Sequence, residues 1–226
     1  MSTIDRVPEP ELMDTPAQVA AYVAADFSEP HQAVVTRFDA RFPAFVGDTV
    51  LDLGCGSGDV TARFALAHPE CRIVGVDAGP VMLAAARRHF AALGIADRIE
   101  ILETHLPDPT IAEHGPFCAV ISNSLLHHLA DPLTMWRSMA IARPGAAVLV
   151  QDLRRPEDEA ALAALVAQHT VGADPVLVED FTHSLRAAYT VAEIESQLAA
   201  TGLDLDRKST RLNSSHIPLS RMPSSA

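Results

Sequence analysis

The sequence predicts an α/β fold built on a doubly wound, mainly parallel sheet. Short apolar runs recur along the chain, and the stretches between them carry apolar residues at helical spacing. Strands that are apolar throughout are buried on both faces, and strands joined through helices pair in parallel by right-handed crossovers. The 226 residues are 48% hydrophobic and 20% charged, which fits one domain with a core of its own.

The first unit of the predicted sheet is a strand, a glycine loop and a helix. Residues 50–53 are apolar with β-type character, and a glycine-rich loop follows at 54–59. Residues 60–68 then carry apolar side chains at helical spacing. Such a unit exposes backbone N–H groups at the start of the helix, where an anionic or polar ligand can bind.

The remaining elements continue the alternation. The second strand, 72–77, leads into a helix over 81–93 that follows Pro80 and ends at Gly94. Further strands are expected at 99–102, 117–121 and 146–151, and further helices at 15–27, 131–142, 157–170 and 190–201, the last with a capping box of Thr190 and Glu193. Sheets of this kind bind ligands at the carboxyl ends of their strands, near the switch point.

The chain is acidic, with 17 Lys and Arg against 29 Asp and Glu and a formal net charge of −12. Because nucleic-acid binders usually spread basic side chains over one face, this balance argues against a nucleic-acid partner. No apolar run approaches the ~20 residues that span a bilayer. The three cysteines have no metal-ligand spacing and fit reduced thiols, so we expect a cytoplasmic protein without a membrane span.

The glycine loop and the acid after the second strand form the main candidate site. Gly54, Gly56 and Gly58 alternate, which lets the backbone turn sharply and approach a ligand closely. Asp77 lies 19 residues after Gly58, where a carboxylate can accept hydrogen bonds from ribose hydroxyls. Each feature has a plainer interpretation, because the glycines could form a structural turn and Asp77 could cap a helix. Together they favour a nucleotide-type ligand.

At these residues the chain resembles the class I S-adenosylmethionine-dependent methyltransferases. The resemblance is carried by VLDLGCGSG at 50–58, VGVD at 74–77, SNSLLHHL at 122–129 and Pro-Gly at 144–145, and it covers roughly residues 45–205. Within that family the chain is similar to the small-molecule branch that includes ubiquinone and menaquinone biosynthesis enzymes. The resemblance implies a Rossmann-like methyltransferase fold, the cofactor S-adenosyl-L-methionine, and methyl transfer to a small molecule by in-line displacement.

The resemblance also implies roles for single residues. The glycine loop would pack against the methionine part of the cofactor, with Asp52 orienting it from beneath and Asp77 holding the ribose. Asn123 would face the methyl-transfer region together with Ser122. The implied cofactor-binding residues are Asp52, Gly54, Cys55, Gly56, Gly58, Asp77, Ala78, Thr104, His105, Ser122 and Asn123.

One position departs from the family pattern. Relatives commonly have an acid after the third strand that contacts adenine, whereas this chain has Thr104 and His105 there. The adenine contact therefore stays open at the level of sequence.

Catalysis by such a site needs no conspicuous acid–base constellation. The sulfonium leaving group is already activated, so the protein mainly positions the reactants and excludes water. His127 and His128 are candidates for a general base, although the sequence favours a structural role for one or both. No metal site is expected, because no histidines fall at a ligand spacing such as His-Glu-x-x-His.

Two other functions remain as alternatives. An NAD(P)-dependent oxidoreductase shares the doubly wound sheet, but its Gly-x-Gly-x-x-Gly pattern would need glycine where Asp59 stands. A non-catalytic methyltransferase-like subunit would keep the fold and serve a partner; the intact loop and Asp77 speak against it.

The last 21 residues differ from the rest of the chain. Lys208 is the only lysine, and residues 206–216 and 220–226 match the translation of a common short-read sequencing adapter, separated by the length of a sample index. We therefore expect 206–226 to be an artefactual, disordered tail, with a natural Ser-rich tail as the alternative. Residues 1–44 are expected to form a helical lid segment and 45–205 a methyltransferase domain truncated at its C-terminus. The strand pair that normally ends this fold is then expected to be missing, leaving the fifth strand as an edge.

Overall fold

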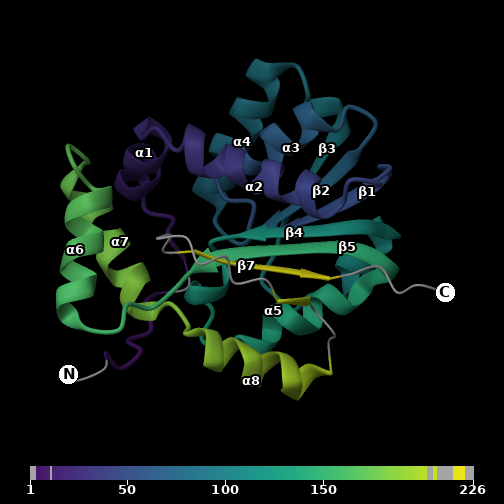
Figure 1. Cartoon of the computed structure of the whole chain (residues 1–226). Coiled ribbons are helices and arrows are strands. Elements are labelled where there is room, and N and C mark those ends of the chain that lie inside the picture. Colours follow the sequence, from purple (N-terminus) through teal and green to yellow (C-terminus); the bar gives the residue numbers. More distant parts are fainter. Residues whose placement is uncertain (1–3, 11, 203–205, 208–215, 222–226) are drawn as a thin grey trace.

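The computed structural model describes residues 4–10, 12–202, 206–207 and 216–221, and its centre is one sheet in the order β3-β2-β1-β4-β5-β7-β6 (Figure 1). The strands are β1 (Thr49–Leu53), β2 (Arg72–Asp77), β3 (Ile99–Glu103), β4 (Phe117–Asn123), β5 (Ala142–Leu153), β6 (Asp206–Arg207) and β7 (His216–Arg221). The pairs formed among β1 to β5 are parallel, as predicted. The strand order reverses between β1 and β4, which makes that point the expected ligand position.

Helices cover both faces of the sheet, because its strands are apolar on both sides. One face carries α2 (Ser28–Arg41), α3 (Asp59–Ala67) and α4 (Pro80–Leu93), and the other carries α5 (Leu133–Ser138) and α8 (Val191–Thr201) (Figure 1). Phe38, Phe64 and Phe90 are buried in the core of the first face. Trp136 and Leu198 are buried in the core of the second.

A third group of helices lies at one end of the sheet, on the left in Figure 1. It consists of α1 (Pro16–Ala24), α6 (Glu159–His169) and α7 (Pro175–Ala187). Leu162 of α6 and Leu185 of α7 are buried against Leu153, the last residue of β5. Val19 of α1 is buried against Met82 of α4. These helices therefore stand at the carboxyl ends of the strands, where they can enclose a ligand.

Several predicted helix ends are confirmed. Thr190 and Glu193 form the expected capping box of α8. Gly94 and Gly202 end α4 and α8 in the left-handed conformation, with φ of 68° and 67°. Short 3-10 turns complete the connections at Ala96–Arg98, Pro109–His114, Leu126–His128 and Met139–Ile141.

Three helices differ from the sequence prediction. Helix α2 lies beyond the helix expected over 15–27, in the segment predicted only as a helical lid. The helix expected over 131–142 ends at Ser138, because the chain passes through a 3-10 turn and enters β5 at Ala142. Helix α7 was not predicted at all. Its start is nevertheless marked in the sequence, since Asp174 caps it by accepting a hydrogen bond from the N–H of Val176, and Pro175 occupies its first turn.

The C-terminal end of the sheet corrects an expectation. We predicted that the final strand pair would be missing and that β5 would be an edge strand; instead β7 pairs antiparallel with β5, and β6 pairs with β7. A ladder uses backbone groups that every residue except proline supplies in full, so the free edge of β5 can pair with an extended segment of unrelated sequence. The adapter origin of 206–226 stays a prediction, and its parts at 208–215 and 222–226 lie outside the described residues.

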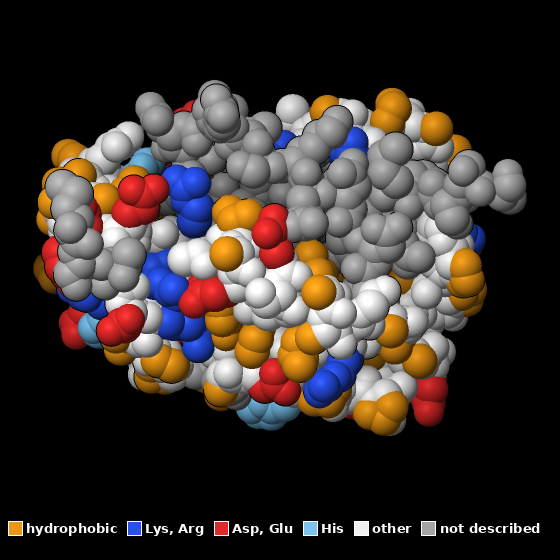
Figure 2. Space-filling view, turned by 60° about the horizontal axis from the view of Figure 1, so that its bottom comes forward, with side chains coloured by type: hydrophobic (Ala, Val, Ile, Leu, Met, Phe, Trp, Pro, Cys, Tyr) orange, Lys and Arg blue, Asp and Glu red, His pale blue; other side chains and the backbone are white. Residues whose placement is uncertain are grey.

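Among the described residues, no helix combines the length and the apolar character needed to cross a membrane. The three cysteines, Cys55, Cys71 and Cys118, are buried and free. Figure 2 shows a face on which the described arginine side chains lie next to acidic ones. This mixed pattern agrees with the acidic composition and differs from the basic face of a typical nucleic-acid binder.

Candidate cofactor and acceptor site

A cavity of about 1310 Å³ opens where β1 and β4 end, at the switch point of the sheet. Its wall includes the glycine loop, the end of β2 and the loop after β4, together with parts of α1, α2 and α7. The predicted site residues on this wall are Asp52, Gly54, Cys55, Gly56, Asp77, Ala78, Thr104, His105, Asn123, His127 and His128. Gly58 and Ser122 are the predicted residues that do not line it.

The backbone at Gly56 is open to the cavity. Gly56 has φ of 52°, and a Cβ placed there would meet nothing within 4 Å. At Gly54 the situation is different, because a Cβ would lie 2.9 Å from the Cβ of Leu125. Gly56 is thus the point at which a ligand can touch bare backbone, whereas Gly54 is bare so that the next loop can pack against it.

Gly58 and Ser122 have structural roles in this geometry. Gly58 precedes α3 with φ of 83°, and a Cβ there would lie 2.4 Å from the ring of Phe90. Ser122 is buried and donates a hydrogen bond to the carbonyl of Leu53 at 2.8 Å. The side chain of Ser122 therefore faces the neighbouring strand instead of the region expected for methyl transfer.

Asp77 joins the glycine loop to the start of α4. Its Oδ2 accepts from the N–H of Gly56 at 2.8 Å, and its Oδ1 accepts from the N–H of Gly79 at 2.9 Å. Burial raises the pKa of Asp77, although these N–H donors act in the opposite direction. The two interpretations of Asp77 are therefore compatible: it holds the first residue before α4 and also stands at the cavity wall.

Asp52 lies beneath the loop and is buried with one strong partner. Its Oδ2 accepts a hydrogen bond from the hydroxyl of Thr61 at 2.6 Å. Burial, with a contribution from the nearby charge of Asp77, raises the pKa of Asp52 to about 7. This acid therefore titrates near neutral pH, far above the ordinary range for aspartate.

Cys55 packs as a small side chain within the loop. Its Sγ lies 3.1 Å from the position that a Cβ on Gly75 would take. Burial and the nearby aspartates raise the pKa of the Cys55 thiol well above its usual value. A protonated, enclosed thiol is a poor nucleophile, which agrees with a filling role.

Thr104 and His105 reach the cavity at the end of β3. The hydroxyl of Thr104 donates to Oδ2 of Asp108 at 2.7 Å, and its backbone N–H donates to the carbonyl of Asp77 at 3.0 Å. Thr104 is thus fixed beside Asp77 with its hydroxyl proton already used.

A polar chain crosses the cavity from α2 to the end of β4. Arg37 donates to the side-chain oxygen of Gln151, and Nε2 of Gln151 donates to Oδ1 of Asn123 at 3.1 Å. All three residues line the cavity. Because the amide oxygen of Asn123 is engaged, its NH₂ group is the part left for a ligand.

The N-terminal helices supply an aromatic and acidic wall. Met13, Tyr22 and Phe27 line the cavity. His31 connects Tyr22 to Asp59, the first residue of α3. Its Nε2 lies 3.4 Å from the Tyr22 hydroxyl, and its Nδ1 lies 2.7 Å from Oδ2 of Asp59.

The pKa values of Tyr22 and Asp59, at the two ends of this hydrogen-bonded series, are strongly shifted. Partial burial would raise the pKa of Asp59, but hydrogen bonds from His31 and Arg63 lower it to about 2. Burial raises the pKa of Tyr22 to about 12, with the charge of Asp59 acting in the same direction. Tyr22 therefore keeps its proton at neutral pH and acts as a hydrogen-bonding and packing group.

His127 and His128 follow β4, and their pKa values shift in opposite directions. Burial would lower the pKa of His127, but the carboxylates of Asp152 and Glu9 outweigh burial and raise it. Burial and the neighbouring charge of His127 lower the pKa of His128 to about 3. His128 is therefore too weak a base to remove a proton near pH 7, whereas the two carboxylates favour the protonated form of His127.

Sequence reasoning expected residues 1–44 to form a lid but did not identify Arg6 and Glu9 as residues of this site. Arg6 donates to the carbonyls of Ala187, His127 and Leu129 at 2.6, 3.1 and 3.3 Å. These bonds place Glu9 beside the histidines. No local pattern marks either residue, since their partners lie more than a hundred positions away.

Comparisons with known proteins agree with this architecture. Residues 50–145 match the family model described as a methyltransferase domain. A ubiquinone biosynthesis O-methyltransferase of Hahella chejuensis is 27% identical over 163 residues, which are 72% of this chain and 65% of that protein. The chain thus spans slightly less than two thirds of this relative's length.

Solved structures show the same fold at lower identity. An O-methyltransferase family protein from Burkholderia thailandensis has a TM-score of 0.67 at 21% identity, over 96% of this chain and 66% of that one. The plantazolicin methyltransferase BpumL in complex with SAH has a TM-score of 0.66 at 14% identity, over 85% and 74%. The glycine loop and Asp77 fall within the matched family segment. Residues 50–145 therefore match a methyltransferase domain, and the solved structures show that the chain has the fold of such enzymes.

Proposed function

We propose that the chain binds S-adenosyl-L-methionine at the glycine-loop end of the cavity and transfers its methyl group to a small-molecule acceptor. The observation that carries this proposal is the bare backbone of Gly56 beside the carboxylate of Asp77 at the cavity wall. The structure with SAH among the similar proteins and the relatives named O-methyltransferases support it. Those names also favour an oxygen atom as the acceptor.

In this proposal the cofactor lies along the glycine loop, at the carboxyl ends of the strands. Asp77 accepts hydrogen bonds from the ribose, Gly54 and Gly56 contact the methionine part, and Thr104 with His105 border the adenine. The acceptor oxygen attacks the methyl carbon from the side opposite sulfur, the S–CH₃ bond breaks, and S-adenosylhomocysteine leaves. The protein supplies orientation and a site shielded from water.

We also propose that the segment 1–44 acts as a lid on the acceptor end. Helices α1 and α2 both contribute to the cavity wall. Oδ1 of Asp14 accepts from the N–H of Met82 in the first turn of α4 at 2.9 Å. This hydrogen bond ties the proposed lid to α4, which begins next to Asp77, the proposed ribose-binding acid.

The test is calorimetry with S-adenosylhomocysteine on the full chain. A hydrogen bond to a charged group contributes roughly 1.5–3 kcal/mol, so Asp77→Ala should weaken binding on the order of ten- to a hundredfold. Asp97→Ala is the matched control, because Asp97 is exposed in the 3-10 turn before β3 and does not line the cavity. Absence of binding by the unmodified, folded chain would refute the proposal, and binding of NAD(P) instead would favour the oxidoreductase.

A further inference from the structure

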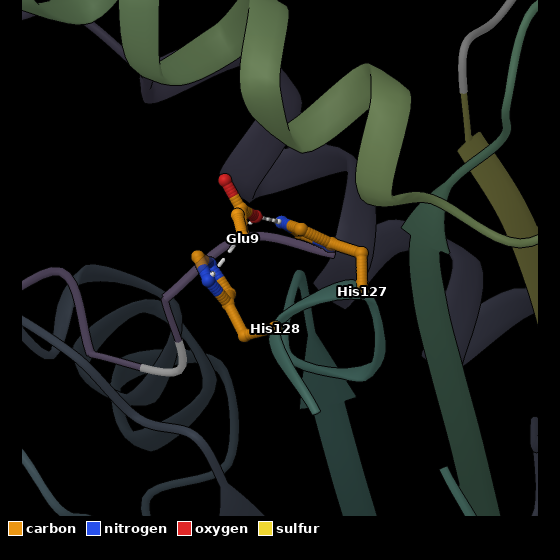
Figure 3. A group of neighbouring side chains, drawn as sticks. All are labelled: Glu9, His127 and His128. Atoms are coloured by element: carbon orange, nitrogen blue, oxygen red, sulfur yellow. Dashed lines mark ion pairs between the residues drawn. The ribbon is translucent and has the colours of Figure 1, made fainter. Parts of the chain in front are cut away.

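Three potential metal ligands converge at the wall of the acceptor end. Glu9 comes from the N-terminal segment, and His127 and His128 come from the 3-10 turn after β4 (Figure 3). Oε1 of Glu9 lies 3.2 Å from Nδ1 of His128 and 3.5 Å from Nε2 of His127. One ligand atom from each of the three residues lies within 4.8 Å of the others.

The two distances from Glu9 to the histidine nitrogens are close to those between ligands of one metal ion. Ligand atoms about 2.1 Å from a metal are roughly 3.0–3.4 Å apart in octahedral to tetrahedral sites. The Nδ1 atom of His128 is buried and has no hydrogen-bond partner, although the Glu9 carboxylate is close by. This buried nitrogen is thus a polar atom without a hydrogen bond, beside a carboxylate that can bind the same ion.

Asp152 supports His127 in the way that carboxylates support metal-binding histidines. Its Oδ1 lies 2.5 Å from Nδ1 of His127 and accepts from the N–H of Leu153, and its Oδ2 accepts from the N–H of Leu126 at 2.7 Å. A carboxylate on Nδ1 fixes the ring so that Nε2 faces the metal position. In the absence of a metal, Nε2 of His127 instead faces Glu9 as an ion pair.

The neighbouring charges accommodate a cation. Glu9 and Asp152 supply two carboxylates at this point, and the guanidinium beside them, that of Arg6, donates to the carbonyls of Ala187, His127 and Leu129. A divalent ion would replace the proton shared by His127 and Glu9, so the number of positive charges at the carboxylates would rise by one.

The donor set selects the type of ion. Two imidazoles and one carboxylate suit Zn²⁺ and similar first-row ions, whereas Mg²⁺ and Ca²⁺ prefer oxygen ligands. Three protein ligands leave at least one coordination position open, as in catalytic zinc sites. Since His127 and His128 both line the cavity, that position would face the acceptor space.

We propose that Glu9, His127 and His128 bind a Zn²⁺-type divalent ion whose open position holds a hydroxyl group of the acceptor. This role rests on the proposed methyl transfer and narrows its substrates to hydroxylated small molecules. The bound hydroxyl releases its proton to solvent, and its oxygen then forms the new bond to the methyl carbon while the S–CH₃ bond breaks. A metal-bound hydroxyl ionises more easily than a free one, so the ion would ease removal of the proton from the acceptor.

The experiment measures binding of Zn²⁺ and Co²⁺ to the untagged full chain by equilibrium dialysis, with the visible spectrum of Co²⁺ reporting the coordination. We expect one ion per chain, a spectrum of a low-coordinate nitrogen–oxygen site, and at least tenfold weaker binding in both Glu9→Gln and His128→Gln. Glu100→Gln and His114→Gln are matched controls, because these two residues form a partly exposed acid–histidine pair at 3.0 Å that is not part of a three-ligand group among the described residues. Neither control should change binding.

Three outcomes would overturn the metal site: no stoichiometric binding, binding that the two variants leave unchanged, or equal losses in the controls. Circular dichroism of each variant identifies a loss that is due to unfolding, and His128→Gln is less exposed to that problem because the Asp152 pair of His127 stays intact. S-adenosylhomocysteine binding measured on the same samples separates the two proposals. A chain that binds this ligand but no metal refutes only the metal site, and a chain that binds metal but not this ligand refutes methyl transfer.

For the hydroxyl, the readout is the Co²⁺ spectrum with added phenol and with anisole as its methyl ether. A spectral change with phenol alone supports coordination of a hydroxyl. Identical spectra with both compounds, or no change with either, would refute that part of the proposal.

Discussion

The two ends of the cavity are assembled in different ways. At the cofactor end, Gly56 lies in the loop after β1 and Asp77 is the last residue of β2, so the ends of neighbouring strands bring them together. At the acceptor end, Glu9 meets His127 only because the N-terminal segment crosses to the loop after β4. The first arrangement needs little beyond the sheet, whereas the second depends on contacts between remote segments. The two ends should therefore respond differently to substitution.

The largest effect is expected from Gly56→Ala, measured as affinity for S-adenosylhomocysteine. The residue has φ of 52° and open space beside it, so the new methyl group would occupy ligand space without a clash inside the protein. We expect a loss of roughly a hundredfold or more, about 2.7 kcal/mol.

Gly145→Ala is the control for the cost to the fold. Its φ is 78°, it also has nothing within 4 Å, and it does not line the cavity. Both variants should lose roughly 1–2 kcal/mol of stability from the left-handed backbone, but only Gly56→Ala should lose affinity. Equal affinity losses in the two variants would contradict the prediction, because they would show that Gly56 affects binding only through the stability of the fold.

A smaller effect is expected from Asp52→Asn, measured as the pH dependence of the free energy of unfolding. Because the pKa of Asp52 is raised from 3.8 to about 7 in the fold, the folded chain binds the extra proton between these values, and stability falls as pH rises through that range. Asparagine keeps an acceptor for Thr61 and removes the titration.

Urea unfolding at pH 5 and pH 8 checks this prediction. The unmodified chain should lose roughly 2–3 kcal/mol more than the variant between the two pH values, at about 1.4 kcal/mol for each unit of pKa. Asp97→Asn should keep the behaviour of the unmodified chain, because Asp97 is exposed. Parallel profiles for all three proteins would show that Asp52 is solvated.

The smallest effect is expected from Arg6→Lys at the acceptor end. Lysine keeps the charge but loses the planar group that contacts the Ala187 and His127 carbonyls and lies 4.1 Å over the ring of Tyr189. We expect roughly 1–2 kcal/mol of local destabilisation. Hydrogen exchange should become faster in residues 4–10, while the central strands and the affinity for S-adenosylhomocysteine stay unchanged.

Arg137→Lys is the matched control for that variant, because Arg137 is exposed and lies 3.7 Å from Asp131 in a surface ion pair. Such a pair contributes about 0–1 kcal/mol. If Arg6→Lys reduced exchange protection throughout the sheet, the N-terminal segment would belong to the central folding unit and the contrast between the two ends would fail.

Sequence reasoning was successful where function depends on the order of strands and turns. The five parallel strands, the glycine loop and the capping box of α8 follow from local patterns, and the structure confirms them. Local patterns did not show which residues face the cavity and which pack against other parts of the chain. Gly58 was assigned to the ligand and packs on Phe90, and Ser122 was placed in the site and bonds to Leu53.

The acceptor end could not be assembled from the sequence, because its residues come together only through tertiary packing. Histidine spacing gave no metal pattern, since the third ligand, Glu9, is 118 positions from His127. The prediction for the edge of the sheet was wrong for the opposite reason. Backbone pairing along β5 depends little on side chains, so a segment without strand-like sequence can still form β7.

Leu125 connects the cofactor end and the acceptor end of the cavity. Its side chain fills the place left free by Gly54, and the two histidines follow it after Leu126. A displacement of the histidine turn toward β1 is therefore resisted by direct contact between Leu125 and the glycine loop. Under the proposed function, the size of one leucine would then limit how closely the acceptor can approach the methyl donor.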